Sequence, residues 1–295
     1  MRSVLFSIGK LNVPGYGFMI GIGFIVALLV GEYRAKKKGL NQESVIDMAI
    51  IAILCGFLGA KLLYVIVNFQ EFIEAPGSVL GRAGFVVYGG IIAGVLCCLL
   101  YCHVKKLSFL QYFDLIIPEV AIAQGFGRIG CFLAGCCYGR QTDSAFGVIF
   151  PEGSLAPAGV KLIPTQLISA AGDILFAVIL IVISDVVFKN VIYGSSRSEA
   201  GRESVDTATE ESARASDAES SEKSASKSKK FGHVAGDIGC LYLWTYGVGR
   251  FFIEFLRDDY RGAVGALSTS QFISLFIVLG GIVLFVFNRR NIKEK

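Results

Sequence analysis

The sequence is poor in charge. Only 18% of its 295 residues are charged, whereas a typical soluble domain has about 25%, and 54% are hydrophobic. This composition argues against a soluble fold. The formal net charge of +4 does not indicate a nucleic-acid partner, because the Lys and Arg residues occur in short clusters between apolar stretches.

Patterns typical of zinc sites and disulfide frameworks are also missing. The chain has 8 cysteines and only two histidines, His103 and His233, and it contains no CxxC pair. The ligand spacing of a zinc site is therefore absent, and we predict no metal and no other cofactor. Most of the cysteines fall inside apolar stretches, where cysteine behaves as a small hydrophobic residue.

Long apolar stretches recur along nearly the whole chain. Each has about 20 residues, the length that crosses a hydrocarbon core of roughly 30 Å. We therefore predict an all-α polytopic membrane protein with about seven transmembrane helices. The predicted spans are 15–33, 45–67, 85–104, 107–136, 164–187, 236–256 and 270–288.

Basic residues follow the odd-numbered spans. Arg34, Lys36, Lys37 and Lys38 follow the first span, Lys105 and Lys106 the third, and Arg289, Arg290, Lys293 and Lys295 the seventh. Because basic loops stay on the cytoplasmic side of a membrane, we predict that the N-terminus lies outside and the C-terminus lies in the cytoplasm.

The apolar pattern is interrupted once. Residues 191–231 are polar and of low complexity, with almost no large apolar side chains, so they cannot form a core. We predict a disordered cytoplasmic insertion here. It separates helices 1–5, in residues 1–190, from helices 6–7, in residues 232–295, which complete the same membrane domain.

Several charged and amide side chains fall inside predicted spans. A charge at the centre of a spanning helix costs about 3 kcal/mol even on a lenient scale, so these side chains should face the protein interior or a watery cavity. They are Asp114, Glu119, Gln124 and Arg128 in the fourth span, Gln166 and Asp173 in the fifth, and Arg250, Glu254 and Arg257 in the sixth.

Four polar residues of the sixth span share one face of the predicted helix. They are Tyr246, Arg250, Glu254 and Arg257, and their spacing places them within an arc of about 80°. Glu254 can pair with either arginine and leave net positive charge, which suits an anion. The alternative is that these charges only pair with one another and lock the helices together.

The end of the fourth span is rich in glycine. Residues 125–140 read GFGRIGCFLAGCCYGR. Glycine allows backbones or a ligand to approach closely, and it permits a helix break where the chain lines a cavity; close helix packing is the alternative explanation. With Arg128, Arg250 and Arg257 available, we predict a phosphate ligand, since guanidinium groups bind phosphate oxygens bidentately. A lipid phosphate is the natural candidate in a bilayer.

These motifs resemble the prolipoprotein diacylglyceryl transferase family, which comprises bacterial inner-membrane enzymes. GRIGCFLAGCCYGR is similar to the glycine-rich motif of the family, and YGVGRFFIEFLRDD is similar to its C-terminal motif. PGYGFM, GAKLLYVIVN, VYGGIIAG and IPTQL provide further matches. Together the matches follow the order of the chain, apart from the 191–231 insertion.

The resemblance implies a function. Such an enzyme transfers the diacylglyceryl group of phosphatidylglycerol to the lipobox cysteine thiol of a prolipoprotein and releases glycerol phosphate, the first step of lipoprotein maturation. The implied partners are phosphatidylglycerol, prolipoprotein signal peptides with a lipobox cysteine and the lipid bilayer, and the implied location is the bacterial plasma membrane.

The resemblance and the residue pattern together suggest a site. Arg128 and Arg250 are the expected phosphate-binding residues, organised by Glu254 and Arg257. The predicted catalytic residues are Arg128, Arg250, Tyr88 and Glu254. The predicted phosphatidylglycerol-binding residues are Arg128, Arg250, Arg257, Tyr16, Tyr246, Gly89, Gly90 and Gly139.

The sequence departs from the family pattern at several positions. Tyr88 stands where many members have histidine, so the usual histidine base is missing, and Cys131 and Cys136 stand where members have asparagine and glutamate. We expect Tyr88 to orient the acceptor while the acceptor thiol loses its proton by another route. For Cys131, Cys136 and Cys137 two hypotheses stay open: a thiol relay, or small side chains that only fill a tight turn.

Two other functions use the same residues. The first is a phospholipid-binding transporter or scramblase that holds the lipid without chemistry. The absence of an inverted internal repeat argues against it. The second is a divergent family member that acts on another lipid acceptor.

Overall fold

The structure is a computed structural model that describes residues 4–8, 11–81, 84–187, 234–258, 262–265 and 267–293. The predicted insertion at 191–231 and His233 lie outside the described residues.

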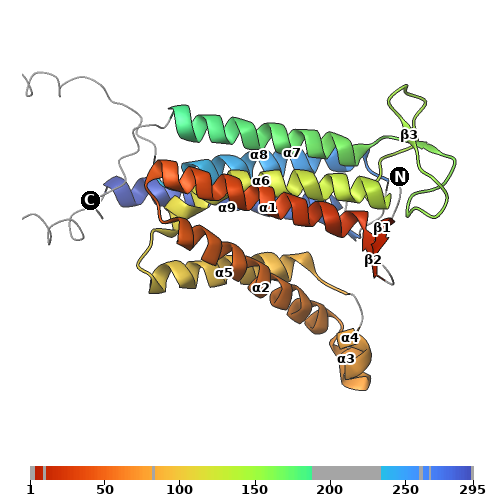
Figure 1. Ribbon diagram of the computed structural model, residues 1–295, viewed down its shortest axis with the longest axis horizontal. Coiled ribbons are helices and arrows are strands. Elements are labelled where there is room, and N and C mark those ends of the chain that lie inside the picture. The colour runs from red at the N-terminus through yellow and green to blue at the C-terminus, as the bar shows by residue number, and fades with distance from the viewer. Residues whose placement is uncertain are drawn as a thin grey trace, which may run out of the picture.

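Seven long helices in the described part of the chain run between two ends of the molecule (Figure 1). They are α1 (Gly15–Lys38), α2 (Gln42–Val67), α5 (Val87–Val104), α6 (Phe109–Ala134), α7 (Thr165–Val182), α8 (Asp237–Ile253) and α9 (Thr269–Lys293). Two short helices, α3 (Phe69–Glu74) and α4 (Pro76–Gly81), lie between α2 and α5. A π-helical turn, Ile183–Val187, extends α7.

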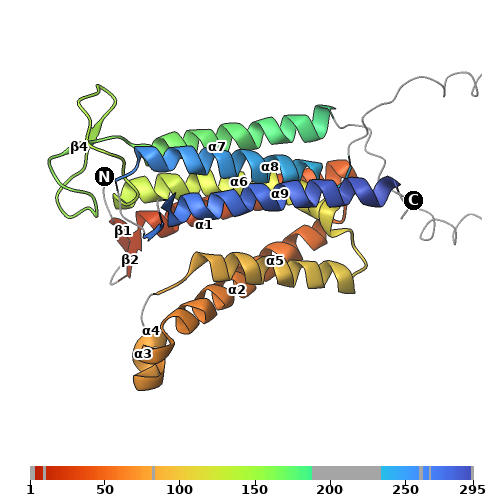
Figure 2. The same ribbon diagram turned by 180° about the vertical axis from the view of Figure 1, so that it is seen from behind.

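The prediction of an all-α polytopic membrane protein is confirmed. Six helices are long and apolar enough to cross a membrane, namely α1, α2, α5, α6, α7 and α9. The remaining long helix, α8, has 17 residues and lies within the bundle (Figure 2). Strand β1 and the C-terminal end of α9 lie at opposite ends of the molecule (Figure 1), as an odd number of crossings requires. The number of crossings and the orientation stay predictions.

The helices form two groups (Figures 1 and 2). Helices α1, α6, α7, α8 and α9 make one bundle, whereas α2 and α5 pack mainly on each other. Glycines allow this close pairing: a Cβ atom on Gly59 or Gly89 would collide with the backbone of the other, and one on Gly90 would lie 2.8 Å from the carbonyl oxygen of Gly56. Small residues at a helix contact let membrane helices associate without a hydrophobic driving force.

Three short antiparallel hairpins were not predicted. They pair β1 (Val4–Ile8) with β2 (Leu11–Pro14), β3 (Val148–Ile149) with β4 (Lys161–Leu162), and β5 (Ala263–Val264) with β6 (Leu267–Ser268). The first two lie at the end of the molecule where α1 begins and α6 ends (Figures 1 and 2). We call this end the hairpin end and the other the network end.

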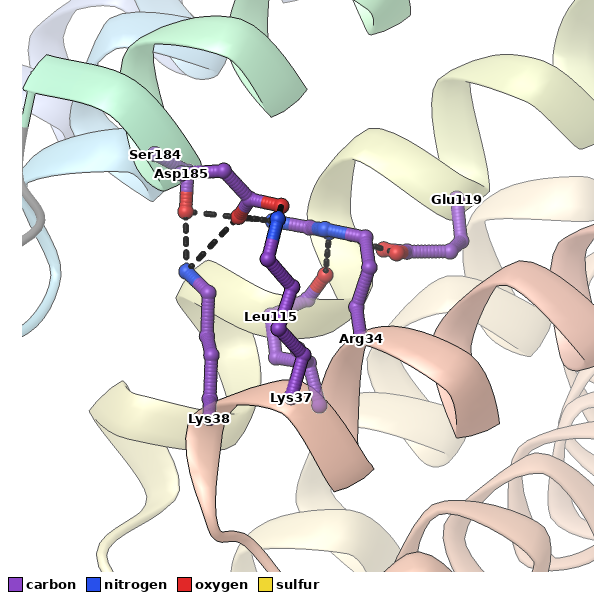
Figure 3. A network of polar contacts seen from close by, with 7 residues as sticks. All are labelled: Arg34, Lys37, Lys38, Leu115, Glu119, Ser184 and Asp185. Carbon is purple, nitrogen blue, oxygen red and sulfur yellow. Dashed lines mark hydrogen bonds and ion pairs between the residues drawn. The ribbon is translucent and has the colours of Figure 1, made fainter.

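A buried ion network joins three helices at the network end (Figure 3). Arg34 of α1 is only 2% exposed. Its Nη1 donates to the carbonyl oxygen of Leu115, 2.7 Å away, and to the carboxylate of Glu119, both on α6. Its Nη2 donates to Ser184 Oγ at 3.1 Å and lies 3.5 Å from Asp185 Oδ1, in the extension of α7. Arg34 therefore ties α1 to α6 and to the extension of α7. The sequence indicated Arg34 only as part of a basic cluster.

A second buried carboxylate fixes the start of α8. Asp114 of α6 accepts hydrogen bonds from the backbone N–H groups of Gly236, at 2.6 Å, and Gly239, at 2.8 Å. The first N–H groups of a helix lack intrahelical partners and carry partial positive charge. Asp114 satisfies two such groups, so this intramembrane charge has a structural role.

Removing one partner of the Arg34–Glu119 pair should destabilise the protein strongly. Glu119→Ala leaves the buried guanidinium with only the more distant carboxylate of Asp185 as its counter-charge, so we expect a loss of about 3 to 5 kcal/mol, measured as thermal unfolding of the purified protein in detergent. The double variant Arg34→Met with Glu119→Leu should recover most of this loss, because it removes both charges.

Lys37→Met is the matched control. Lys37 also reaches Asp185, at 3.3 Å, but its side chain is 55% exposed, so its loss should cost no more than about 1 kcal/mol. If Glu119→Ala unfolds at the wild-type temperature, the network does not hold the helices together.

Candidate functional site

Arg128 and Arg250 both lie near the hairpin end of the bundle. Arg128 lies in the last two turns of α6 and Arg250 in the last turn of α8, and both helices end on this side (Figures 1 and 2). The charges of the two guanidinium groups act on each other, and both act on the carboxylate of Asp173 in α7. Three helices thus bring two cations and one anion within electrostatic range of one another.

One nitrogen of the Arg250 guanidinium has no hydrogen-bond partner among the described residues. Its Nη2 donates to Ser270 Oγ at 2.9 Å and lies 2.9 Å from Glu254 Oε2. Its Nη1 is buried and has no hydrogen-bond partner among the described residues. Since an unsatisfied buried donor costs about 1 to 3 kcal/mol, an anionic ligand that accepts from Nη1 would relieve this cost.

Glu254 bridges two arginines, but the chain is no longer α-helical there. Helix α8 ends at Ile253, Glu254–Leu256 form a 3₁₀ turn, and Arg257 is extended, with φ −92° and ψ 155°. The prediction that a single helix face carries all four polar residues is therefore wrong at Arg257. The predicted pairing is present, since Glu254 Oε2 lies 2.9 Å from Arg250 Nη2 and 3.9 Å from Arg257 Nε.

Gly139 lies where three segments of the chain come together. It forms a β-bridge with Arg257, and its N–H donates to the carbonyl oxygen of Ile163 at 3.0 Å. A Cβ atom at this position would lie 2.7 Å from Thr165 Cγ2. Close backbone approach explains the glycine, and its predicted contact with lipid stays a prediction.

The chain reverses sharply after α6. Gly135 takes the left-handed conformation, with φ 73°, and the N–H of Cys136 donates to the carbonyl oxygen of Cys131 at 3.1 Å. The N–H of Gly135 also donates to Phe132 at 3.2 Å, which completes the Schellman end of a helix. The break therefore lies at Gly135, and the earlier glycines belong to a continuous helix.

This reversal gathers three thiols. The Sγ atoms of Cys131, Cys136 and Cys137 all lie within 4.8 Å of one another, and the last two are 3.7 Å apart. Hydrogen bonds with the thiols of Cys131 and Cys137, followed by burial, raise the pKa of the Cys136 thiol. Because the thiolate is the nucleophile, this surrounding argues against a thiol relay through Cys136.

Two side chains at the start of α7 hold the loop that carries the thiols. Thr165 Oγ1 donates to the carbonyl oxygen of Cys137, and Gln166 Nε2 donates to that of Cys136, each at 2.8 Å. Both side chains are buried. They belong to the IPTQL segment, and the sequence alone did not assign them to the site. Cys137 itself takes a left-handed conformation, with φ 65°, which costs a non-glycine residue about 1 to 2 kcal/mol.

Tyr16, at the start of α1, lies beside α6 next to Arg128. A Cβ atom on Gly130 would lie 3.2 Å from Tyr16 Cδ2, and Tyr16 interacts electrostatically with Arg128 and the three thiols. Its predicted place in the site lining stays a prediction.

Tyr246 lies one turn before Arg250 on α8 and belongs to a stack of rings. Its ring is 5.5 Å from that of Tyr242, which in turn is 6.1 Å from Phe176 of α7. The hydroxyl of Tyr242 donates to Gln124 Oε1 of α6 at 2.6 Å. The sequence marks Gln124 and Asp173 as costly intramembrane polar residues but does not assign them to the site. No pattern in the sequence indicates Tyr242.

Tyr88, Gly89 and Gly90 belong to the α2–α5 pair. Tyr88 is the second residue of α5 and is 42% exposed. Both glycines make the close contact with α2 described above, so the structure assigns them a packing role. Their predicted contacts with lipid stay predictions.

The fold defines a polytopic membrane protein, and Arg128 and Arg250 lie on two helices of its bundle. The chain belongs to the prolipoprotein diacylglyceryl transferase family, whose profile matches residues 3–196 and 223–287. The resemblance suggested by the sequence is thereby confirmed.

Similar proteins cover almost the whole chain. The phosphatidylglycerol–prolipoprotein diacylglyceryl transferase of Clostridium tetani is 41% identical over 290 residues, which are 98% of this chain and 97% of that protein. The transferase numbered 2 of Clostridium perfringens is 39% identical over 291 residues, 98% of this chain and 96% of the relative. The transferase of Finegoldia magna is 29% identical over 294 residues, 99% of this chain and 98% of the relative.

Removing the Thr165 hydroxyl should loosen the loop that carries the thiols. Thr165→Val keeps the shape but leaves the buried Cys137 carbonyl without its donor, so we expect a loss of about 1 to 3 kcal/mol in thermal stability and faster maleimide labelling of Cys136 and Cys137. Thr245→Val is the control, because Thr245 is exposed and bonds within its own helix. Equal labelling rates in both variants would show that Thr165 does not hold the loop.

Proposed function

We propose that this chain transfers the diacylglyceryl group of phosphatidylglycerol to the lipobox cysteine thiol of prolipoproteins and releases glycerol phosphate. The observation that carries the proposal is the convergence of Arg128 and Arg250 inside the bundle of a chain that matches transferases along nearly its whole length. The substrates follow from the names of those relatives.

The arginine pair suits the leaving group of this reaction. When the acceptor sulfur attacks the glycerol carbon, the C–S bond forms, the C–O bond to phosphate breaks, and its electron pair moves onto the phosphate oxygen. Donors aimed at developing charge are often the largest contribution to catalysis. In this proposal Arg250 Nη1 donates to the departing phosphate, and the positive charge of Arg128 also stabilises the negative charge of that phosphate. Glu254 holds Arg250 in place through the 2.9 Å ion pair.

An apolar groove beside Arg250 offers a place for an acyl chain. It has a volume of about 360 Å³ and lies between α8 and α9, where Gly247, Phe251 and Phe252 face Leu275 and Leu279. A lipid whose phosphate lies at Arg250 would extend its acyl chain along this groove. Tyr246 and Tyr16 would line the space nearer to the headgroup.

The proposed location is the bacterial plasma membrane, with the site opening outward. The chain is a multi-pass membrane protein, and the ends of α1, α5 and α9 that carry clustered basic residues lie at the network end. By the positive-inside rule this end is cytoplasmic, which places Arg128 and Arg250 toward the outer side.

Loss of either arginine should abolish most turnover. We expect Arg128→Ala and Arg250→Ala each to lower the transfer rate by at least about 100-fold, the typical cost of losing one transition-state donor. The measurement is the thioether product formed from phosphatidylglycerol and a lipobox peptide by purified protein. Arg290→Ala, at the exposed end of α9, is the control.

Three outcomes would contradict the proposal. Near-normal turnover in either arginine variant would remove the phosphate role. Movement of phospholipid between leaflets without any thioether product would instead support a transporter or scramblase, and a product on another acceptor would indicate a divergent family member.

Tyr88 has a separate test. If its hydroxyl orients the acceptor, Tyr88→Phe should raise the KM for the lipobox peptide while the KM for phosphatidylglycerol stays unchanged. Steady-state kinetics with each substrate varied in turn measure both values. Full activity in Tyr88→Phe excludes this role.

A further inference from the structure

The three thiols beside Arg128 form a compact triangle that the transfer mechanism leaves unexplained. Their Sγ atoms lie within 4.8 Å of one another, and the Cys136–Cys137 separation is 3.7 Å. Cys131 and Cys137 are 9% and 8% exposed. Space filling alone would be served as well by alanine or serine.

This spacing is that of a metal-binding thiolate set. Zinc binds thiolate sulfur at about 2.3 Å in a tetrahedral arrangement, which places sulfur atoms about 3.8 Å apart. Only small side-chain movements separate the observed triangle from that geometry. CxxC spacing is not needed here, because the helix end at Gly135 folds Cys136 back over Cys131.

The backbone around the thiols is held in advance. Cys137 is in the left-handed region, with φ 65°, and such strained residues persist only where their surroundings fix them. Here Thr165 and Gln166 bond the carbonyl oxygens of Cys137 and Cys136. Ligands held in place by hydrogen bonds of their own are a regular feature of metal sites.

We propose that Cys131, Cys136 and Cys137 bind a thiophilic divalent metal ion, zinc in the cell, and leave a fourth position open for the thiol of the acceptor. Among the described residues no histidine or carboxylate joins this cluster. Three protein ligands with one open position are typical of a catalytic zinc site. The metal site stands on the geometry alone, whereas the use of the open position rests on the proposed function.

The charges around the cluster favour this arrangement. Three thiolates and one divalent cation carry a net charge of −1, and the charge of Arg128 acts directly on Cys131. Arg128 lies three residues before Cys131 on α6, so the same guanidinium would contact the lipid phosphate and balance the metal site. The acceptor sulfur and the lipid headgroup would then meet at one place.

The site would supply the route by which the acceptor loses its proton. The acceptor thiol takes the fourth position as a thiolate and releases its proton to water. Its sulfur then forms the C–S bond to the glycerol carbon while the C–O bond breaks, and the electron pair leaves with glycerol phosphate. The metal returns unchanged, so no oxidant or reductant is consumed. This chain has Tyr88 where a histidine base is usual. A metal-bound thiolate would provide the deprotonated acceptor sulfur that the tyrosine does not provide.

Cadmium is the probe that tests the site, because cadmium–thiolate bonds absorb in the ultraviolet in proportion to their number. The reduced, metal-stripped full-length protein in detergent is titrated with CdCl₂, and zinc is then added as a competitor. We expect one cadmium ion per chain, bound by three thiolates. Cys131→Ser and Cys136→Ser should each weaken binding by at least about 100-fold, since the loss of even an outer partner costs about 10- to 100-fold.

Cys55→Ser and Cys97→Ser are the matched controls. These two thiols also lie together, across α2 and α5, but they are away from Arg128 and should leave the titration unchanged. Thermal unfolding of each variant shows whether it is folded. Absence of cadmium binding by folded wild-type protein, or equal binding by the Cys131 and Cys136 variants, overturns the metal site; if transfer from phosphatidylglycerol persists in that protein, the proposed function stands without it.

A lipobox peptide tests the open position. Added to the cadmium-loaded protein, the cysteine peptide should raise the thiolate absorbance by roughly one third, as a fourth sulfur joins three, whereas the same peptide with serine should not. An unchanged spectrum with the cysteine peptide, in a protein that binds cadmium, overturns the role in thiol activation and leaves a metal that only stabilises the loop.

Discussion

A charge inside an apolar bundle needs a counter-charge, and this requirement organises the molecule. At the network end, Arg34 is almost fully buried, and its Nη1 and Nη2 atoms donate hydrogen bonds to α6 and to the extension of α7. Asp114 fixes the start of α8 in the same region. These contacts join helices that are distant in sequence, and they hold α6, α7 and α8 in the register that brings Arg128, Asp173 and Arg250 together at the other end.

Each end of the molecule gathers three cations and two carboxylates. At the network end, Asp185 alone is approached by Arg34, Lys37 and Lys38. At the hairpin end, three arginines, Arg128, Arg250 and Arg257, face two carboxylates, Glu254 and Asp173, which leaves a net charge of +1 for these five side chains. A buried donor of Arg250 also lacks a partner among the described residues. The network end has the same balance, since Arg34, Lys37 and Lys38 meet Glu119 and Asp185, and it also holds buried polar atoms without a hydrogen-bond partner among the described residues.

The turn after α6 links Arg128 to the thiols. Gly135 ends the helix in a left-handed conformation and returns the chain over Cys131, and the start of α7 receives the loop through Thr165 and Gln166. Gly139 then lets this loop pair with the segment after α8, which carries Arg257. Arg128 and the thiols therefore lie on one connected piece of backbone, which the bridge from Gly139 to Arg257 ties to the segment after α8.

The sequence by itself determined the class of protein, the approximate positions of the long helices and the family. Apolar runs of spanning length, intramembrane charges and collinear motifs are local features, so they can be recognised without knowing which helices touch. The pairing of Glu254 with its neighbouring arginines could likewise be predicted, because the partners are three and four residues apart.

Only the tertiary structure decided which distant groups meet. Arg34 with Glu119, Asp114 with the start of α8, and Asp173 with two arginines all depend on helix packing, which leaves no pattern along the chain. Arg257 leaves the helix because it pairs with Gly139, and Gly89 and Gly90 face α2 because that helix approaches closely. The thiol triangle depends on the left-handed conformation of Gly135. Rules based on the sequence spacing of metal ligands do not take such a conformation into account.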